Sequence, residues 1–151
     1  MTRARRRGAD LRRKLGLTGR VDAETVANLH GFAVQRLPLL IQKELEVDGY
    51  IGIADRLGPE DTRWYIAHSL GHKLMHPGNH LWVYRNSMLG CKYEREANDF
   101  ARNLLTDDWE AIKEGLTCSL EVAHYFGVPE EFVRLQAPLG FRGRADESVG
   151  S

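Results

Sequence analysis

Two histidines four positions apart, His68 and His72, are the residues of this chain best suited to chemistry. Residues at this spacing lie on the same face of a helix, so their imidazoles can bind one cation together. Zinc accepts histidine nitrogen at about 2.0–2.1 Å, and a catalytic zinc has three protein ligands and one open position. The spacing therefore predicts a zinc site whose third ligand comes from elsewhere in the chain.

An acidic segment further along the chain can supply that ligand. Residues 94–98 read Glu-Arg-Glu-Ala-Asn. Positions 94 and 98 share a helix face, so we expect Glu94 to ligate and Asn98 to hydrogen-bond a metal-bound histidine. Glu96 points about 160° away from Glu94 around the helix axis, so we expect it to face away from the metal.

Ser69 follows the first histidine, at the position where the HExxH motif places its general base. A serine hydroxyl cannot act as a base near neutral pH, and losing a positioned acid/base group costs on the order of 10²–10⁴ in rate. A bound zinc would still polarise a carbonyl and acidify water. The sequence therefore predicts zinc binding with impaired hydrolysis, and we expect Ser69→Glu to raise peptidase activity.

Other side chains could reach the cleft from nearby turns or from loops. We expect His76, His80, Tyr84 and His124 to steady an oxyanion rather than to replace the base. Glu96 is the nearest substitute base in the sequence, but its expected orientation away from the metal argues against that role. His76 could instead be an ordinary helix-end residue. Cys91, three residues before Glu94, is either a thiol near the metal or a buried, inert one.

A sheet and two helices are needed to position these residues. Apolar periodicity and stop signals predict helices at 22–30, about 60–75, 91–105, 108–114, 119–126 and 130–136. An extended segment is expected at 32–40, and a hairpin at 44–53 turning at Asp48-Gly49. This order predicts an α+β fold with a small, mostly antiparallel sheet. Residues 50–54 are expected as an edge strand where a peptide could pair, or as an ordinary strand.

Composition excludes several classes of function. The chain has 151 residues, which suits one domain, and its 21 basic and 21 acidic side chains cancel. A zero balance argues against a bulk nucleic-acid binder. Because the sequence shows neither a membrane-spanning run nor the apolar part of a signal peptide, we expect a cytoplasmic protein without a membrane partner.

Basic charge is concentrated at the amino end. Residues 3–14 carry seven cations opposed by Asp10: Arg3, Arg5, Arg6, Arg7, Arg12, Arg13 and Lys14. We expect a flexible leader at 1–20, or an arm that touches phosphate or an acidic partner. The folded domain is expected at 21–137, with a flexible tail at 138–151.

Two segments resemble motifs of the ImmA/IrrE-type zinc metallopeptidases. Residues 64–76, WYIAHSLGHKLMH, resemble that family's RFxxAHExGHxxLH helix, and residues 94–105, EREANDFARNLL, resemble its ExEANxFAxxLL helix. The resemblance extends over about residues 21–137. It implies a minimal gluzincin (zincin-like) domain, in which a small sheet packs on the HxxxH helix and a helical C-terminal half follows.

The resemblance also implies a site and a partner. Zinc would be held by His68, His72 and a glutamate of the second helix. Members of the family cut repressor proteins, so the partner implied here is a protein or peptide of the transcriptional-repressor class. Three functions stay open: a zinc-binding pseudo-peptidase, an active endopeptidase with a rescued base, and a metal-free partner-binding module. The sequence leaves the oligomeric state open.

Overall fold

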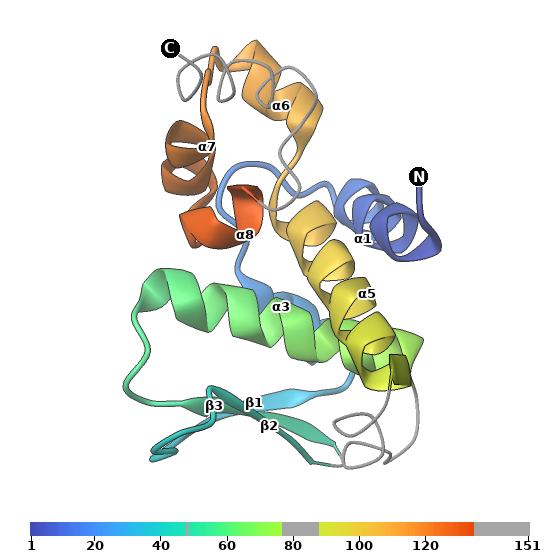
Figure 1. Cartoon of the computed structure of the whole chain (residues 1–151), viewed down its shortest axis with the longest axis vertical. Coiled ribbons are helices and arrows are strands. Elements are labelled where there is room, and N and C mark those ends of the chain that lie inside the picture. The colour runs from blue at the N-terminus through green and yellow to red at the C-terminus, as the bar shows by residue number, and fades with distance from the viewer. Residues whose placement is uncertain (48, 77–87, 135–151) are drawn as a thin grey trace.

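The computed structural model describes residues 1–47, 49–76 and 88–134, in which one face of a small sheet carries a long helix (Figure 1). The strands are β1 (Ala33–Leu37), β2 (Glu44–Val47) and β3 (Tyr50–Ala54). The helices are α1 (Arg3–Lys14), α2 (Ala23–Leu29), α3 (Pro59–Met75), α5 (Met88–Leu105), α6 (Asp108–Lys113), α7 (Ser119–Phe126) and α8 (Glu130–Arg134). The predicted α+β class is confirmed.

The sheet has the strand order β1-β3-β2 and is mixed. β2 runs antiparallel to β3 through the turn at Gly49, whose φ is 84°. β1 runs parallel to β3, so only one of the two strand pairs has the antiparallel form that we expected to dominate. The expectation of an edge strand at 50–54 is wrong, because β3 is the central strand and pairs with β1 on one side and β2 on the other. Ile51, Ile53 and Ala54 of this strand are completely buried.

Helix α3 lies across the sheet, and α5 crosses α3 on its other side (Figure 1). α3 begins with Pro59 at its first turn, followed by two acids that suit the positive end of a helix. A Cβ atom on Gly71 would lie 3.0 Å from Phe100 Cδ1, so the glycine lets the two helices approach closely. This crossing brings the predicted histidine and glutamate segments together.

The amino end differs from the expected flexible leader, because residues 3–14 form helix α1 and pack along α5. Ala4, Gly8 and Arg12 form its buried face. A Cβ atom on Gly8 would collide with the backbone carbonyl of Phe100, so only glycine fits this contact. Small residues four apart among arginines contribute little apolar signal, which is why the pattern predicts a solvated leader.

Helix α2 packs on α3 and β1, and helices α7 and α8 pack on each other, with α8 also contacting α5. Gly127 ends α7 in the left-handed conformation with φ 68°, and α8 then returns to α3. The rings of Trp64 and Phe132 stack with centroids 4.2 Å apart and join α8 to α3. None of the described helices is both long and apolar enough to cross a membrane. The predicted tail at 138–151 lies outside the described residues, and so do His80 and Tyr84.

Candidate metal centre

His68 and His72 point their Nε2 atoms at one carboxylate, that of Glu94 on α5. The distances are 3.1 Å from His68 Nε2 to Glu94 Oε2 and 2.8 Å from His72 Nε2 to Glu94 Oε1. Both imidazoles are buried, with side chains 4% exposed, whereas 59% of the Glu94 side chain is exposed. Two lone-pair donors and a carboxylate therefore converge at one point with access to solvent.

His76 and Glu96, two of the weaker sequence candidates, are connected to the second nitrogen of His72. His72 Nδ1 lies 3.2 Å from His76 Nδ1, and His76 Nε2 lies 3.4 Å from Glu96 Oε1. Glu96 therefore does not contact the Nε2 atoms of His68 and His72, in agreement with its predicted orientation on the helix. It is connected to His72 through His76. His76 is more than a helix-end residue, since its imidazole links His72 with this carboxylate.

The second nitrogen of His68 meets a residue that no motif marks, Glu44 on β2. Glu44 Oε1 lies 2.6 Å from His68 Nδ1, and its other oxygen accepts a hydrogen bond from the Ser69 hydroxyl. The oxygen lies off the direction of the His68 N–H, so the contact is a close ion pair rather than a linear hydrogen bond. We call the six residues His68, His72, His76, Glu44, Glu94 and Glu96 the histidine cluster.

The hairpin register contained a signal for Glu44. A two-residue turn at Asp48-Gly49 places Glu44 opposite Ile53, and this is the observed pairing. Directly paired residues of antiparallel strands project from the same face, and Ile53 is completely buried. An acid on the inward face of a strand is rare unless it has a partner. That partner is supplied by α3.

Charge in the cluster is strongly coupled. Burial alone would lower the pKa of His68, but Glu44 and Glu94 outweigh burial and raise the pKa to about 10. Burial would raise the pKa of Glu94, but the hydrogen bonds and charges of His68 and His72 hold it well below its usual value. A positive charge is therefore favoured between these carboxylates, as a cation site requires.

The donor set fits zinc, which prefers histidine nitrogen and carboxylate oxygen in such proportions. Ligand atoms of Glu44, His68 and His72 also lie within 4.8 Å of one another, so Glu44 must be considered as a ligand. One imidazole cannot direct both nitrogens to the same ion. Because both Nε2 atoms face Glu94, the geometry favours His68, His72 and Glu94, with Glu44 behind His68.

Three other candidates take different places. Within the described ranges the Asn98 side chain makes no hydrogen bond with His68 or His72, and its predicted supporting role stays a prediction. His124 is exposed on α7 and does not join the histidine cluster. Cys91 is exposed on α5, so the expectation of a buried thiol is wrong.

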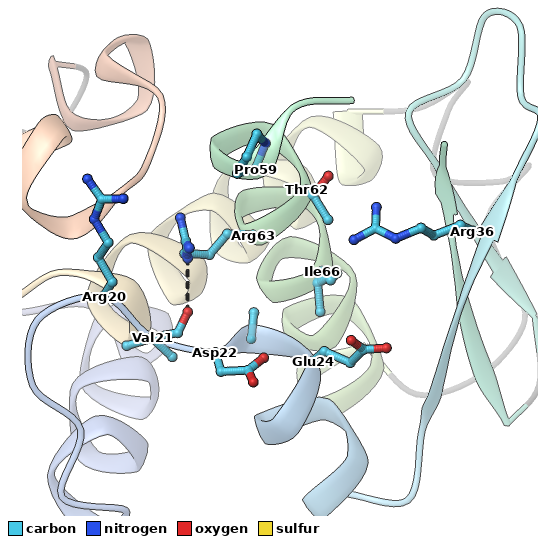
Figure 2. Close-up of a pocket in the computed structure, with 10 residues that line it drawn as sticks. Arg20, Val21, Asp22, Glu24, Arg36, Pro59, Thr62, Arg63 and Ile66 are labelled. Carbon is cyan, nitrogen blue, oxygen red and sulfur yellow. Dashed lines mark hydrogen bonds between the residues drawn. The ribbon is translucent and has the colours of Figure 1, made fainter. Parts of the chain in front are cut away.

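A separate pocket of about 400 Å³ opens beside the first half of α3 (Figure 2). Its lining includes arginines and acids but none of the residues of the histidine cluster. The lining residues are Arg20, Val21, Asp22, Ala23, Glu24, Arg36, Pro59, Thr62, Arg63 and Ile66. Arg63 Nε donates to the carbonyl of Val21 at 2.9 Å, so this guanidinium serves to hold α3 to the chain before α2. The pocket is therefore separate from the histidine cluster in its lining residues.

Comparison with known proteins identifies relatives of this chain. Residues 26–137 match the family described as the IrrE N-terminal-like domain. The uncharacterised immunity region protein 2 of Bacillus phage phi105 is 33% identical over 91 residues, which cover 58% of each chain. A Mycobacterium tuberculosis transcriptional regulator has a TM-score of 0.66 over 93% of this chain and 50% of its own, at 17% identity, which shows a shared fold. The match covers 58% of the length of the phage protein and 50% of that of the regulator.

Proposed function

This chain belongs to the IrrE N-terminal-like family, and we propose that it is a zinc-binding protein of metallopeptidase fold with little hydrolytic activity. The ligands are His68, His72 and Glu94. One observation carries the proposal: two buried imidazoles direct their Nε2 atoms at a single carboxylate, at 3.1 and 2.8 Å. Domain limits at 21–137 stay a prediction, which the family match to 26–137 supports.

The residues around the ligands support binding better than turnover. Zinc, when bound, would polarise a carbonyl and acidify water. The family's helix places a glutamate next to the first histidine to take the proton from the attacking water, and Ser69 stands at that position. Its hydroxyl is a weak acid that already donates to Glu44, so it cannot accept that proton. A loss on the order of 10²–10⁴ in rate follows.

The partner proposed here is a protein of the transcriptional-repressor class, bound rather than cut. The family resemblance and the phage relative named for its immunity region both support a setting of gene regulation. An edge strand beside the cluster, β2, has one side unpaired within the described sheet, and an extended segment of a partner can add to such an edge.

Metal analysis and a cleavage assay test this proposal together. Protein purified without chelator should contain close to one zinc per chain, and His72→Ala should contain almost none. Incubated with zinc, the wild-type protein should bind a repressor encoded beside it and leave it intact. If the metal analysis finds no zinc in the wild-type protein, the ligand assignment is contradicted.

An active endopeptidase is the second candidate, and one observation favours it: Glu44 brings a carboxylate to the Ser69 hydroxyl. Both oxygens of that carboxylate already have partners on α3, which is why we place this candidate second. Specific cleavage of the repressor by wild-type protein, abolished by chelator and by His72→Ala, would establish this candidate and remove the first.

A further inference from the structure

Glu44 reaches the histidine cluster from β2 and joins two consecutive residues of α3. One carboxylate oxygen lies 2.6 Å from His68 Nδ1, and the other accepts from the Ser69 hydroxyl. The Glu44 side chain is 19% exposed, and His68 and Ser69 are buried. A charge enclosed to this extent is costly unless it is paired and hydrogen-bonded, and these two contacts meet that need.

His68 needs such a partner on its second nitrogen. Its Nδ1 atom is buried and has no well-aligned hydrogen-bond acceptor in the described part of the chain. A histidine that ligates a metal through one nitrogen usually directs the other to a carboxylate or carbonyl, which fixes the tautomer and the ring orientation. Glu44 is the carboxylate in reach of this nitrogen, while Nε2 faces Glu94.

Ser69 and Glu44 suit each other sterically and electrostatically. Ser69 is fully buried, so any larger side chain there must enter space that neighbouring groups already fill. A glutamate at this position would bring its carboxylate to the one on Glu44, and two like charges in one enclosed site repel. The short hydroxyl avoids this conflict and donates a hydrogen bond instead.

Resting on the proposed function, we propose that Glu44 is a positioning residue of the zinc centre, which holds His68 from β2 and is itself anchored by the Ser69 hydroxyl. The serine is then the partner of a carboxylate supplied by the sheet. Ser69→Glu alone would therefore disturb the site rather than restore it, contrary to the expectation from the motif. A glutamate at 69 would need Glu44 to be removed.

Zinc affinity measured by competition with a chromophoric chelator tests this role. Glu44→Gln keeps the size of the side chain and removes its charge, and it should weaken zinc binding about 10–100-fold at unchanged stoichiometry. Glu60→Gln, an exposed glutamate in the first turn of α3, is the matched control and should bind like wild type. Circular dichroism checks that each variant is folded.

Cobalt absorption separates a positioning residue from a ligand. With Co²⁺ in place of zinc, Glu44→Gln should keep the shape of the wild-type visible spectrum, whereas Glu94→Gln should change it, because only Glu94 ligates. If Glu44→Gln does not fold, Ser69→Ala gives the second measurement: it frees the Glu44 carboxylate and should weaken zinc binding in the same direction, by a smaller factor.

The failure of this inference is distinguishable from failure of the proposed function. Wild-type protein that takes up no zinc overturns both. If wild-type protein binds zinc and the zinc affinity of Glu44→Gln lies within twofold of the wild-type affinity, only the role of Glu44 is overturned. A Glu44→Gln cobalt spectrum altered like that of Glu94→Gln has the same consequence.

An exchange of the two residues tests their coupling. Ser69→Glu should lower the thermal unfolding midpoint and the zinc affinity, and adding Glu44→Ser should raise both again, because one of two facing carboxylates is removed. Strictly additive effects of the two substitutions would mean that the side chains do not interact, which would overturn the proposal.

Discussion

Helix α5 takes part in two ionic clusters, one in its amino-terminal half and one at its carboxyl end, and the two clusters have different capacities. Towards its amino end, Glu94 meets the imidazoles of the histidine cluster. At its carboxyl end, the carbonyl of Leu104 accepts from Arg12, whose guanidinium also lies 3.1 Å from Glu110. We call Arg12, Gly19, Leu104 and Glu110 the arginine cluster.

The difference lies in the chemistry of the cation. A guanidinium has donors but no lone pair, and it stays protonated in proteins, so the arginine cluster can only hold the fold together. Imidazoles offer lone pairs once a proton leaves, and the Nε2 atoms of His68 and His72 converge on one point. Buried charge alone therefore does not indicate function; convergent lone-pair donors with solvent access do.

The largest expected effect comes from breaking the arginine cluster. Arg12→Met should lower the free energy of unfolding by about 3–5 kcal/mol, because it leaves Glu110 without its buried cation and the Leu104 carbonyl without a donor. Urea unfolding measures this loss, and zinc affinity should not change. The control Arg13→Met, at a side chain 79% exposed, should alter stability by less than about 0.5 kcal/mol. Equal losses in both variants would contradict this structural role.

Zinc should stabilise the protein through the histidine cluster alone. At a free concentration 100 times its Kd, a ligand that binds only the folded state adds about 2.7 kcal/mol. Unfolding in zinc-buffered urea should show this gain in wild type and also in Arg12→Met, if enough of that variant remains folded. His72→Ala should show none. A gain of the same size in His72→Ala would place the metal elsewhere.

The approach of α1 to α5 can be tested at Gly8. Gly8→Ala should cost about 1–3 kcal/mol, because the added Cβ meets a backbone carbonyl that cannot move aside as a side chain could. Thermal or urea unfolding measures the loss, with Arg7→Ala on the exposed side of the same helix as control. A neutral Gly8→Ala would show that α1 is not held this closely.

The smallest effect is a pH dependence in the arginine cluster. Burial would raise the pKa of Glu110, but hydrogen bonds from Gly19, Tyr125 and Arg12 outweigh it and lower the pKa below its ordinary value of 4.5. A lowered carboxyl pKa stabilises the fold above the unfolded-state pKa, and this contribution is lost as the pH falls through the folded-state pKa. Unfolding at pH values from 7 downward should therefore show a shallower acid decline for Glu110→Gln than for wild type. Parallel curves would contradict the shift.

Local spacing accounts for a large part of the fold and of the site. Helices α3 and α5, the hairpin turn at Gly49 and the pair His68 and His72 were predictable, because hydrogen bonding within a helix or hairpin relates residues at fixed short intervals. Glu94 also followed from its own helix, since the face it shares with position 98 can be read from the sequence. In the same way, the sequence alone shows that Ser69 stands where the motif usually has a glutamate.

Tertiary structure decided the partners of these residues. Glu44 lies 24 positions before His68 in the chain and meets it only because the hairpin register turns it inward and α3 crosses the sheet there. Arg12 reads as one more charge in a basic run, yet it is buried because Gly8 lets α1 pack against α5. Both depend on contacts between distant segments, which no short interval in the sequence encodes. The sequence by itself therefore predicted the histidines and one acidic segment of a candidate metal site, and only the packing of the sheet and helices brought Glu44 to His68.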